Sequence, residues 1–158
     1  LTMAATTGNV STVRLLLKNK AEIEFDAEIE KSTFHWPMAK SQTQCLDELC
    51  DHVVKNKTRN KHGLSALQWA ASLGNAALTK ALASHGADLN EKDSKGKTAL
   101  LMAVEAGHRQ AVSALLEAGA DVSIPDDNGK TPMEHAKLNG LHEIAKALAE
   151  PRTPAKQP

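Results

Sequence analysis

Short blocks of apolar residues at helical spacing alternate with polar, glycine-containing stretches along the chain. One block places four apolar residues on a single helix face: Ala111, Val112, Leu115 and Leu116. The block over residues 99–106 precedes it, with Thr98 placed to cap this helix and Gly107 placed to end it. Because isolated helices below about 12 residues are marginal in water, we expect such helices to be stabilised by packing against one another.

The whole pattern repeats at a fixed interval. Residues 93–108 recur, 33 positions later, as residues 126–141, and the same interval in the other direction leads to residues 60–75. Three glycines share one register: Gly74, Gly107 and Gly140. The stretch from Gly119 through Gly129 is rich in Gly, Asp, Asn and Pro, which is typical of a turn or hairpin. Each unit is therefore predicted to be two short helices and a turn.

The last unit carries the signals of a terminal repeat. Pro132 takes the first helical position after Thr131, and Glu134 completes a capping box. The second helix of this unit, over residues 141–150, carries four polar residues that can meet solvent: His142, Glu143, Lys146 and Glu150. We interpret residues 126–150 as a C-terminal cap. Residues 151–158 contain three prolines, and we interpret them as a disordered linker tail rather than a docking motif.

These motifs resemble the ankyrin repeats. The resemblance rests on three openings: Gly63-Leu-Ser-Ala-Leu-Gln-Trp-Ala, Gly96-Lys-Thr-Ala-Leu-Leu-Met-Ala and Gly129-Lys-Thr-Pro-Met-Glu-His-Ala. It also rests on endings such as Glu117-Ala-Gly-Ala-Asp-Val-Ser. The resemblance implies an all-α repeat solenoid of about four to five helix-turn-helix units with hairpin fingers. We assign residues 1–150 to one such domain, with units at 1–26, 27–59, 60–92, 93–125 and 126–150.

The first two units depart from this pattern. Residues 1–26 match only the later part of a unit, which predicts a truncated repeat and a longer parent protein. Residues 27–59 form a degenerate unit with four departures: Glu30 for the turn glycine, Pro37 for a helix alanine, Ser41 for the inter-helix glycine and Val53 for the terminal glycine. Proline removes a helix hydrogen bond, so we expect a short, kinked or displaced first helix there. A second helix is predicted over residues 43–52, with Leu46 and Leu49 in the core.

Composition narrows the class of protein. The chain has 25 alanines and 19 leucines, which favours closely stacked helices. With 19 basic and 19 acidic residues and 3% aromatics, it lacks the basic field and stacking residues of a nucleic-acid binder. No apolar run approaches the roughly 20 residues of a membrane span, so no membrane insertion is expected. Two cysteines and the absence of a charged-then-apolar leader favour the cytoplasm or the nucleus.

Possible chemical sites have plainer structural interpretations. Cys45 and Cys50 are predicted to be buried thiols on one helix rather than zinc ligands. Gly96-Lys97-Thr98 resembles the end of a phosphate-binding loop, but Glu91 stands where that loop needs its first glycine. His35 and His108 are read as structural, because they match histidines of the family. The sequence shows no nucleophile motif, so we expect no enzyme activity, no cofactor, no metal and no small-molecule substrate.

Charge is patterned even though the net charge is zero. Residues 22–30 alternate acidic with apolar side chains at the period of a strand, and a basic run over residues 55–61 follows one repeat later. A 33-residue stack would make these two segments neighbours. They either neutralise each other, which is worth about 0–1 kcal/mol for exposed pairs, or present acidic and basic bands to a partner.

Ankyrin-like stacks bind other proteins through their concave surface and hairpin tips, and the resemblance implies this function here. Carried over by position, this surface comprises Lys61, His62, Leu64, Trp69, Ser72, Leu73, Ser94, Lys95, Lys97, Glu105, Asp127, Asn128 and Lys130. Trp69 is either a binding anchor or part of the packing between repeats. We therefore predict a non-catalytic module that binds another protein or peptide. The alternative is a targeting or autoinhibitory arm of a larger enzyme or channel.

Overall fold

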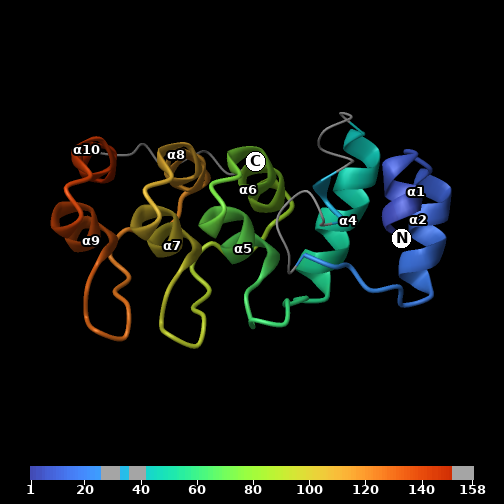
Figure 1. Cartoon of the computed structure of the whole chain (residues 1–158), viewed down its shortest axis with the longest axis horizontal. Helices are drawn as coiled ribbons and strands as arrows, with labels where there is room; N and C mark the ends of the chain where they lie inside the picture. The colour runs from blue at the N-terminus through green and yellow to red at the C-terminus, as the bar shows by residue number, and fades with distance from the viewer. Residues whose placement is uncertain (26–32, 36–41, 151–158) are drawn as a thin grey trace. The chain divides into compact units, whose positions relative to one another are not determined.

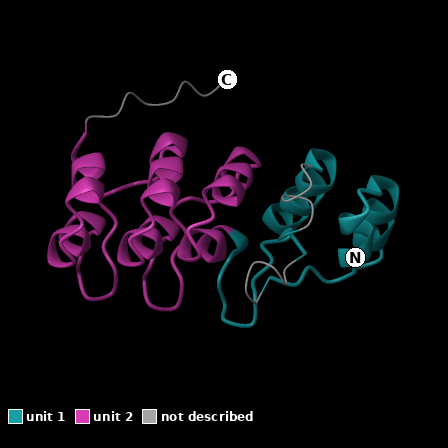
Figure 2. Ribbon diagram, turned by 45° about the horizontal axis from the view of Figure 1, so that its top comes forward, with its two compact units in different colours: residues 1–66 teal, residues 67–158 magenta. Residues whose placement is uncertain are grey.

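The computed structural model describes residues 1–25, 33–35 and 42–150. The chain divides into two compact units, Leu1–Ala66 and Leu67–Pro158, coloured separately in Figure 2. The described residues form helices and turns, with a single isolated antiparallel bridge between Arg59 and Ser65 in the first unit. This architecture confirms the predicted all-helical repeat fold.

Helices of the second unit come in pairs. The first helices of the pairs are α5 (Ala66–Ser72, which begins at the unit boundary), α7 (Ala99–Glu105) and α9 (Pro132–Leu138). The second helices are α6 (Ala76–Ser84), α8 (Arg109–Ala118) and α10 (His142–Ala149). The first helices form one layer and the second helices another, and hairpin loops project from the side of the first layer that faces away from the second helices (Figure 1).

Local sequence sets where these helices begin and end. The Thr98 side chain accepts a hydrogen bond from the Leu101 N–H at the start of α7, and Thr131 and Glu134 form both halves of a capping box at the start of α9. Gly119 ends α8 in the left-handed conformation, with φ of 96°. These predicted caps are therefore confirmed.

The core of the second unit consists of aliphatic and small side chains between the two layers. Six of its leucines are fully buried: Leu67, Leu78, Leu82, Leu100, Leu101 and Leu115. Buried alanines such as Ala70, Ala103 and Ala111 let neighbouring backbones approach closely. The polar residues of α10 face solvent while Ile144 and Leu148 are buried, which confirms the predicted two-faced terminal helix.

Two polar side chains tie one repeat of this unit to the next. Gln68 is buried, and its Nε2 donates hydrogen bonds to the carbonyl oxygens of Glu91 at 2.9 Å and Lys97 at 3.3 Å. His108 Nε2 donates to the Ser72 carbonyl at 3.1 Å. Its ring lies so close to Gly74 that a β-carbon there would overlap it. The structural interpretation of His108 is thus confirmed.

The first unit contains α1 (Thr2–Thr6), α2 (Val10–Lys18) and α4 (Thr43–Lys55). Cys45 and Cys50 are buried on α4 as free thiols, as predicted, and burial raises the pKa of the Cys50 thiol to about 12. Leu49 is buried and Leu46 is half-buried. Arg14 on α2 donates to Glu48 on α4 through both Nε at 2.7 Å and Nη2 at 2.6 Å, joining the two helices.

The predicted end of α4 is wrong. Val53, expected in place of the terminal glycine, is a buried helical residue, because α4 continues to Lys55. The left-handed residue that follows this helix is Lys57, with φ of 48°. Since the hairpin residue Asn60 keeps its place in the 33-residue register, the extra helical turn replaces residues that form a loop in later repeats. Packing of Cys50 and Val53 against the core favours this extension over an earlier turn.

Several expectations lie outside the described residues. These are the departures at Glu30, Pro37 and Ser41, the acidic residues beyond Phe25, and the tail over residues 151–158. Within the described segment 21–25, Glu22 and Glu24 are exposed while Ile23 and Phe25 are buried, so the predicted alternation is confirmed there. None of the helices among the described residues is long and apolar enough to cross a membrane.

Replacing Lys57 by glycine should stabilise the first unit. A non-glycine residue in the left-handed conformation costs about 1–2 kcal/mol, so Lys57→Gly should raise the free energy of unfolding by roughly 1 kcal/mol relative to Lys57→Ala. Urea denaturation measures this difference, and the alanine variant controls for the lost charge. Equal stability of the two variants would contradict the role assigned to this conformation.

Candidate functional site

The three hairpin tips share one construction. Asn60, Asp93 and Asp126 each begin a tip, and each Oδ1 accepts hydrogen bonds from the backbone N–H groups two and four residues later, at 2.8–3.0 Å. Backbone hydrogen bonds between the first and last residues of the tip close each hairpin, as from the Asp126 N–H to the Lys130 carbonyl at 3.0 Å. The tip geometry is therefore held by the Asx side chain and the backbone.

Most predicted contact residues lie on these tips or beside the first helices. The exposed ones are Lys61, His62, Leu73, Ser94, Lys95, Asp127, Asn128 and Lys130. The half-buried ones are Leu64, Ser72, Lys97 and Glu105, whereas Trp69 is buried. Lys61, His62 and Leu64 belong to the first unit and the others to the second unit.

Adjacent hairpins of the second unit touch. The Asp127 N–H approaches the Lys95 carbonyl at 3.4 Å, and the Asp127 carboxylate lies against Gly96, where a β-carbon would overlap it. Lys92 Nζ donates to the Pro125 carbonyl at 2.8 Å. The tips at residues 93–97 and 126–130 thus form one continuous surface.

A network of four charged or polar side chains lies behind this surface. Lys97 Nζ contacts both carboxylate oxygens of Glu105, at 2.6 and 2.9 Å, and both side chains are only about one-quarter exposed, at 26% and 27%. His135 on α9 lies between two carboxylates, with Nδ1 3.5 Å from Glu105 Oε1 and Nε2 3.1 Å from Asp126 Oδ2. Lys97 and Glu105, expected to contact a partner, are therefore engaged with each other.

Asp126 is the most buried member of this network, with a side-chain exposure of 2%. The Lys130 backbone N–H, together with His135 and the Asn128 backbone N–H, stabilises its charged form. These hydrogen bonds lower the pKa of the Asp126 carboxyl from its ordinary 3.8 to about 2, against the opposing effect of burial.

Glu105, Asp126 and His135 offer ligand atoms within 4.8 Å of one another, and each of these side chains already contacts another charged or polar group of the protein. Glu105 lies near Nδ1 of His135, and Asp126 lies near Nε2 of the same ring. The Lys97 ammonium also contacts both oxygens of Glu105. This geometry is that of a hydrogen-bonded ion network between neighbouring repeats.

Asp126 and His135 were not predicted from the sequence as members of the site. The signal for Asp126 was present in the repeats, because an Asx residue stands three positions before glycine at residues 60, 93 and 126. His135 had no such signal. Its counterparts one and two repeats earlier are Met102 and Trp69, and only tertiary structure places the ring between two carboxylates.

Comparison with known families agrees with this geometry. The model for ankyrin repeats (3 copies) matches residues 1–93 and 85–157. The chain belongs to the ankyrin-repeat family. Among the curated proteins, a search found no match. Its ankyrin hairpin tips lie at residues 60–64, 93–97 and 126–130, and its first helices are α5, α7 and α9.

Trp69 should behave as a packing residue. Its 4% exposure means that removing the indole leaves a cavity, so Trp69→Ala should lower the free energy of unfolding by about 3–5 kcal/mol. Trp69→Phe, which keeps an apolar ring, should lose clearly less. Thermal and urea unfolding measure both variants. An alanine variant as stable as the wild type would indicate that the indole is available for a partner.

Acid should destabilise the second unit through Asp126. Because its folded-state pKa is depressed, its charged form stabilises the fold above about pH 4, and this contribution is lost as the pH falls toward about 2. Asp126→Asn keeps the Oδ1 acceptor of the turn but cannot titrate. Urea midpoints measured between about pH 5 and pH 2 should therefore fall more steeply in the wild type than in Asp126→Asn. Parallel curves would contradict the assignment.

Proposed function

We propose that this chain is a non-catalytic module that binds a partner protein through its hairpin tips and first helices. Ankyrin repeats are generally protein–protein interaction modules, and ankyrin domains are typically non-catalytic. We assign the same role, binding another protein, to the hairpin tips and first helices of this chain.

The shared construction of the tips is the observation that carries the proposal. The Asx turn holds the backbone of each tip in the same way, while the two exposed side chains between Asx and glycine differ in chemistry. These pairs are Lys61 with His62, Ser94 with Lys95, and Asp127 with Asn128. A constant backbone that presents different side chains supports selective recognition at little conformational cost.

Lys97 and Glu105 belong to the half-buried ion network, so we assign them to holding this surface in place. Their mutual contact, together with His135, fixes the first-helix layer behind the tips. Leu73 at the end of α5 and Leu138 at the end of α9 remain exposed, at 42% and 66%, and add apolar area. Side chains that are held in place before binding lose less entropy when a partner docks.

Removing the tip side chains should weaken partner binding without unfolding the chain. The variant Lys95→Ala/Asp127→Ala/Asn128→Ala/Lys130→Ala removes four exposed side chains and keeps the Asx residues. Quantitative affinity capture followed by mass spectrometry should show at least one protein retained by the wild type and reduced roughly tenfold in the variant. Loss of a few contact residues at an interface accounts for a change of this size.

A matched control variant changes exposed side chains on the second helices instead. Lys80→Ala/Gln110→Ala/Glu117→Ala/Lys146→Ala alters the same number of residues on α6, α8 and α10. It should capture the same proteins as the wild type. If the tip variant and the control lose binding equally, or neither loses it, the assignment of the contact surface is wrong.

A further inference from the structure

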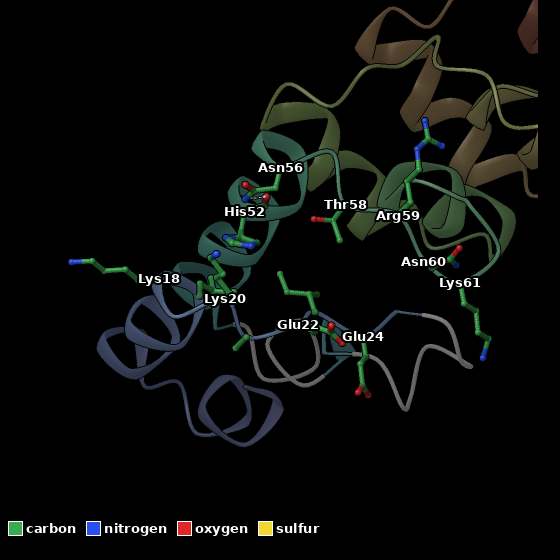
Figure 3. Close-up of a pocket in the computed structure, with 13 residues that line it drawn as sticks. Lys18, Lys20, Glu22, Glu24, His52, Asn56, Thr58, Arg59, Asn60 and Lys61 are labelled. Carbon is green, nitrogen blue, oxygen red and sulfur yellow. Dashed lines mark hydrogen bonds between the residues drawn. The ribbon is translucent and has the colours of Figure 1, made fainter.

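A cleft of about 730 Å³ lies in the first unit, between the segments that follow α2 and α4 (Figure 3). The described residues that line it carry both signs of charge, as in Lys18 and Lys20 beside Glu22 and Glu24. Its charge therefore does not select one class of ligand. The ion network of the second unit is more informative, because its geometry distinguishes two protonation states of one side chain.

This ion network connects the two hairpin tips of the second unit. Lys97 ends the first tip and contacts Glu105 on α7 at 2.6 Å. Glu105 Oε1 lies 3.5 Å from His135 Nδ1, and His135 Nε2 lies 3.1 Å from Asp126 Oδ2. Asp126 begins the second tip, and its other oxygen accepts hydrogen bonds from the tip backbone. The His135 ring is therefore in the middle of a continuous path of contacts between the two tips.

The surroundings of His135 match a ring that carries a proton on both nitrogens. A neutral imidazole has one N–H donor and one nitrogen lone pair, whereas the imidazolium has two donors. Each ring nitrogen of His135 faces a carboxylate oxygen, from Glu105 on one side and Asp126 on the other. In the neutral ring, one of these oxygens faces a lone pair. In the protonated ring, both oxygens face an N–H.

The charges around the ring favour the same state. The side chains of His135, Asp126 and Glu105 are 14%, 2% and 27% exposed, so water screens their charges incompletely. Glu134, on the same helix as the ring, interacts with it and with Lys130. Helix α10 also packs on α9, but no ion pair among the described residues joins it to the ring. Protonation of the ring gives the four side chains of the network equal numbers of positive and negative charges.

Helix packing at this position does not require a histidine. The residues one and two repeats earlier are Met102 and Trp69, and both are buried apolar side chains. Burial by itself disfavours a charged imidazole, so His135 replaces a favourable apolar side chain by a costly polar one. The contacts with Glu105 and Asp126 offset this cost, and they give the histidine a role beyond filling space.

We propose that His135 is a pH-sensitive link between the two tips of the second unit. The protonated ring binds Glu105 and Asp126 together and holds the tips in a fixed relative position. Loss of the proton removes this attraction, so partner binding by the tips weakens as the pH rises between about 5 and 8, where histidine changes its charge. The effect on binding rests on the proposed function, whereas the link itself is measurable without a partner.

His135→Met tests the link through stability, because methionine occupies the equivalent position in the preceding repeat. The protonated ring stabilises the fold, so its contribution should be lost as the pH rises. The ratio of the wild-type to the variant folding constant should be roughly tenfold larger at about pH 5.5 than at about pH 8. Urea unfolding with EDTA present measures this ratio and removes metal binding as a cause. This range lies above the one in which Asp126 titrates.

A matched control changes an exposed histidine instead. His142→Met, on α10, should show the same pH dependence of stability as the wild type. A second measurement reports the proton itself: ¹⁵N NMR of the His135 ring distinguishes two N–H groups from one. Glu105→Gln removes one of the two carboxylates, so the ring of this variant should lose its proton at lower pH than the wild-type ring.

Binding is then measured with a protein that the wild type captures through its tips. Its retention should be roughly tenfold lower at about pH 8 than at about pH 6, and clearly less affected in His135→Met. A stability ratio independent of pH, a titration of the ring unchanged by Glu105→Gln, or equal retention at both pH values would each overturn the proposal. If the tips capture no protein, the proposed function fails, while urea unfolding and NMR still decide whether the link exists.

Discussion

The helices of the second unit cannot exist independently, and this constraint governs the molecule. They have seven to ten residues each, below the length at which isolated helices are stable in water. Their stability comes from burying leucines such as Leu82 and Leu115 between two layers, at distances that alanines permit. Because every pair depends on its neighbours, a change that opens one interface between repeats weakens the helices on both sides.

Polar groups then fix how neighbouring repeats are positioned. Gln68 reaches two carbonyls of the following hairpin, and His135 joins α9 to both Glu105 and Asp126. These bonds are directional, whereas apolar packing alone would tolerate small sliding movements between repeats. Because the repeats are fixed in this way, the positions of the hairpin tips are fixed as well. Fixed positions are needed by a surface that recognises a partner by shape and charge.

The first unit shows how a repeat can change while its period is kept. An added turn in α4 is balanced by a shorter segment before the hairpin at Asn60, and Lys57 takes the left-handed conformation that glycine adopts at Gly86 and Gly119. The cleft is bounded by this altered segment and by the residues after α2. The longer α4 and the shorter loop after it thus occur beside a cleft that the 33-residue spacing does not predict.

Sequence periodicity by itself determined the helix pairs, their caps at Thr98 and Thr131, and the glycine that ends α8, since these depend on neighbours within a few residues. It also indicated which positions form the tips. It could not place the end of α4, because the helix continues through Val53, whose side chain is buried in the core. Nor could it show that Trp69 is buried, that Lys97 is held by Glu105, or that His135 lies between two carboxylates. Those features join residues from different elements, and only tertiary structure brings them within contact distance.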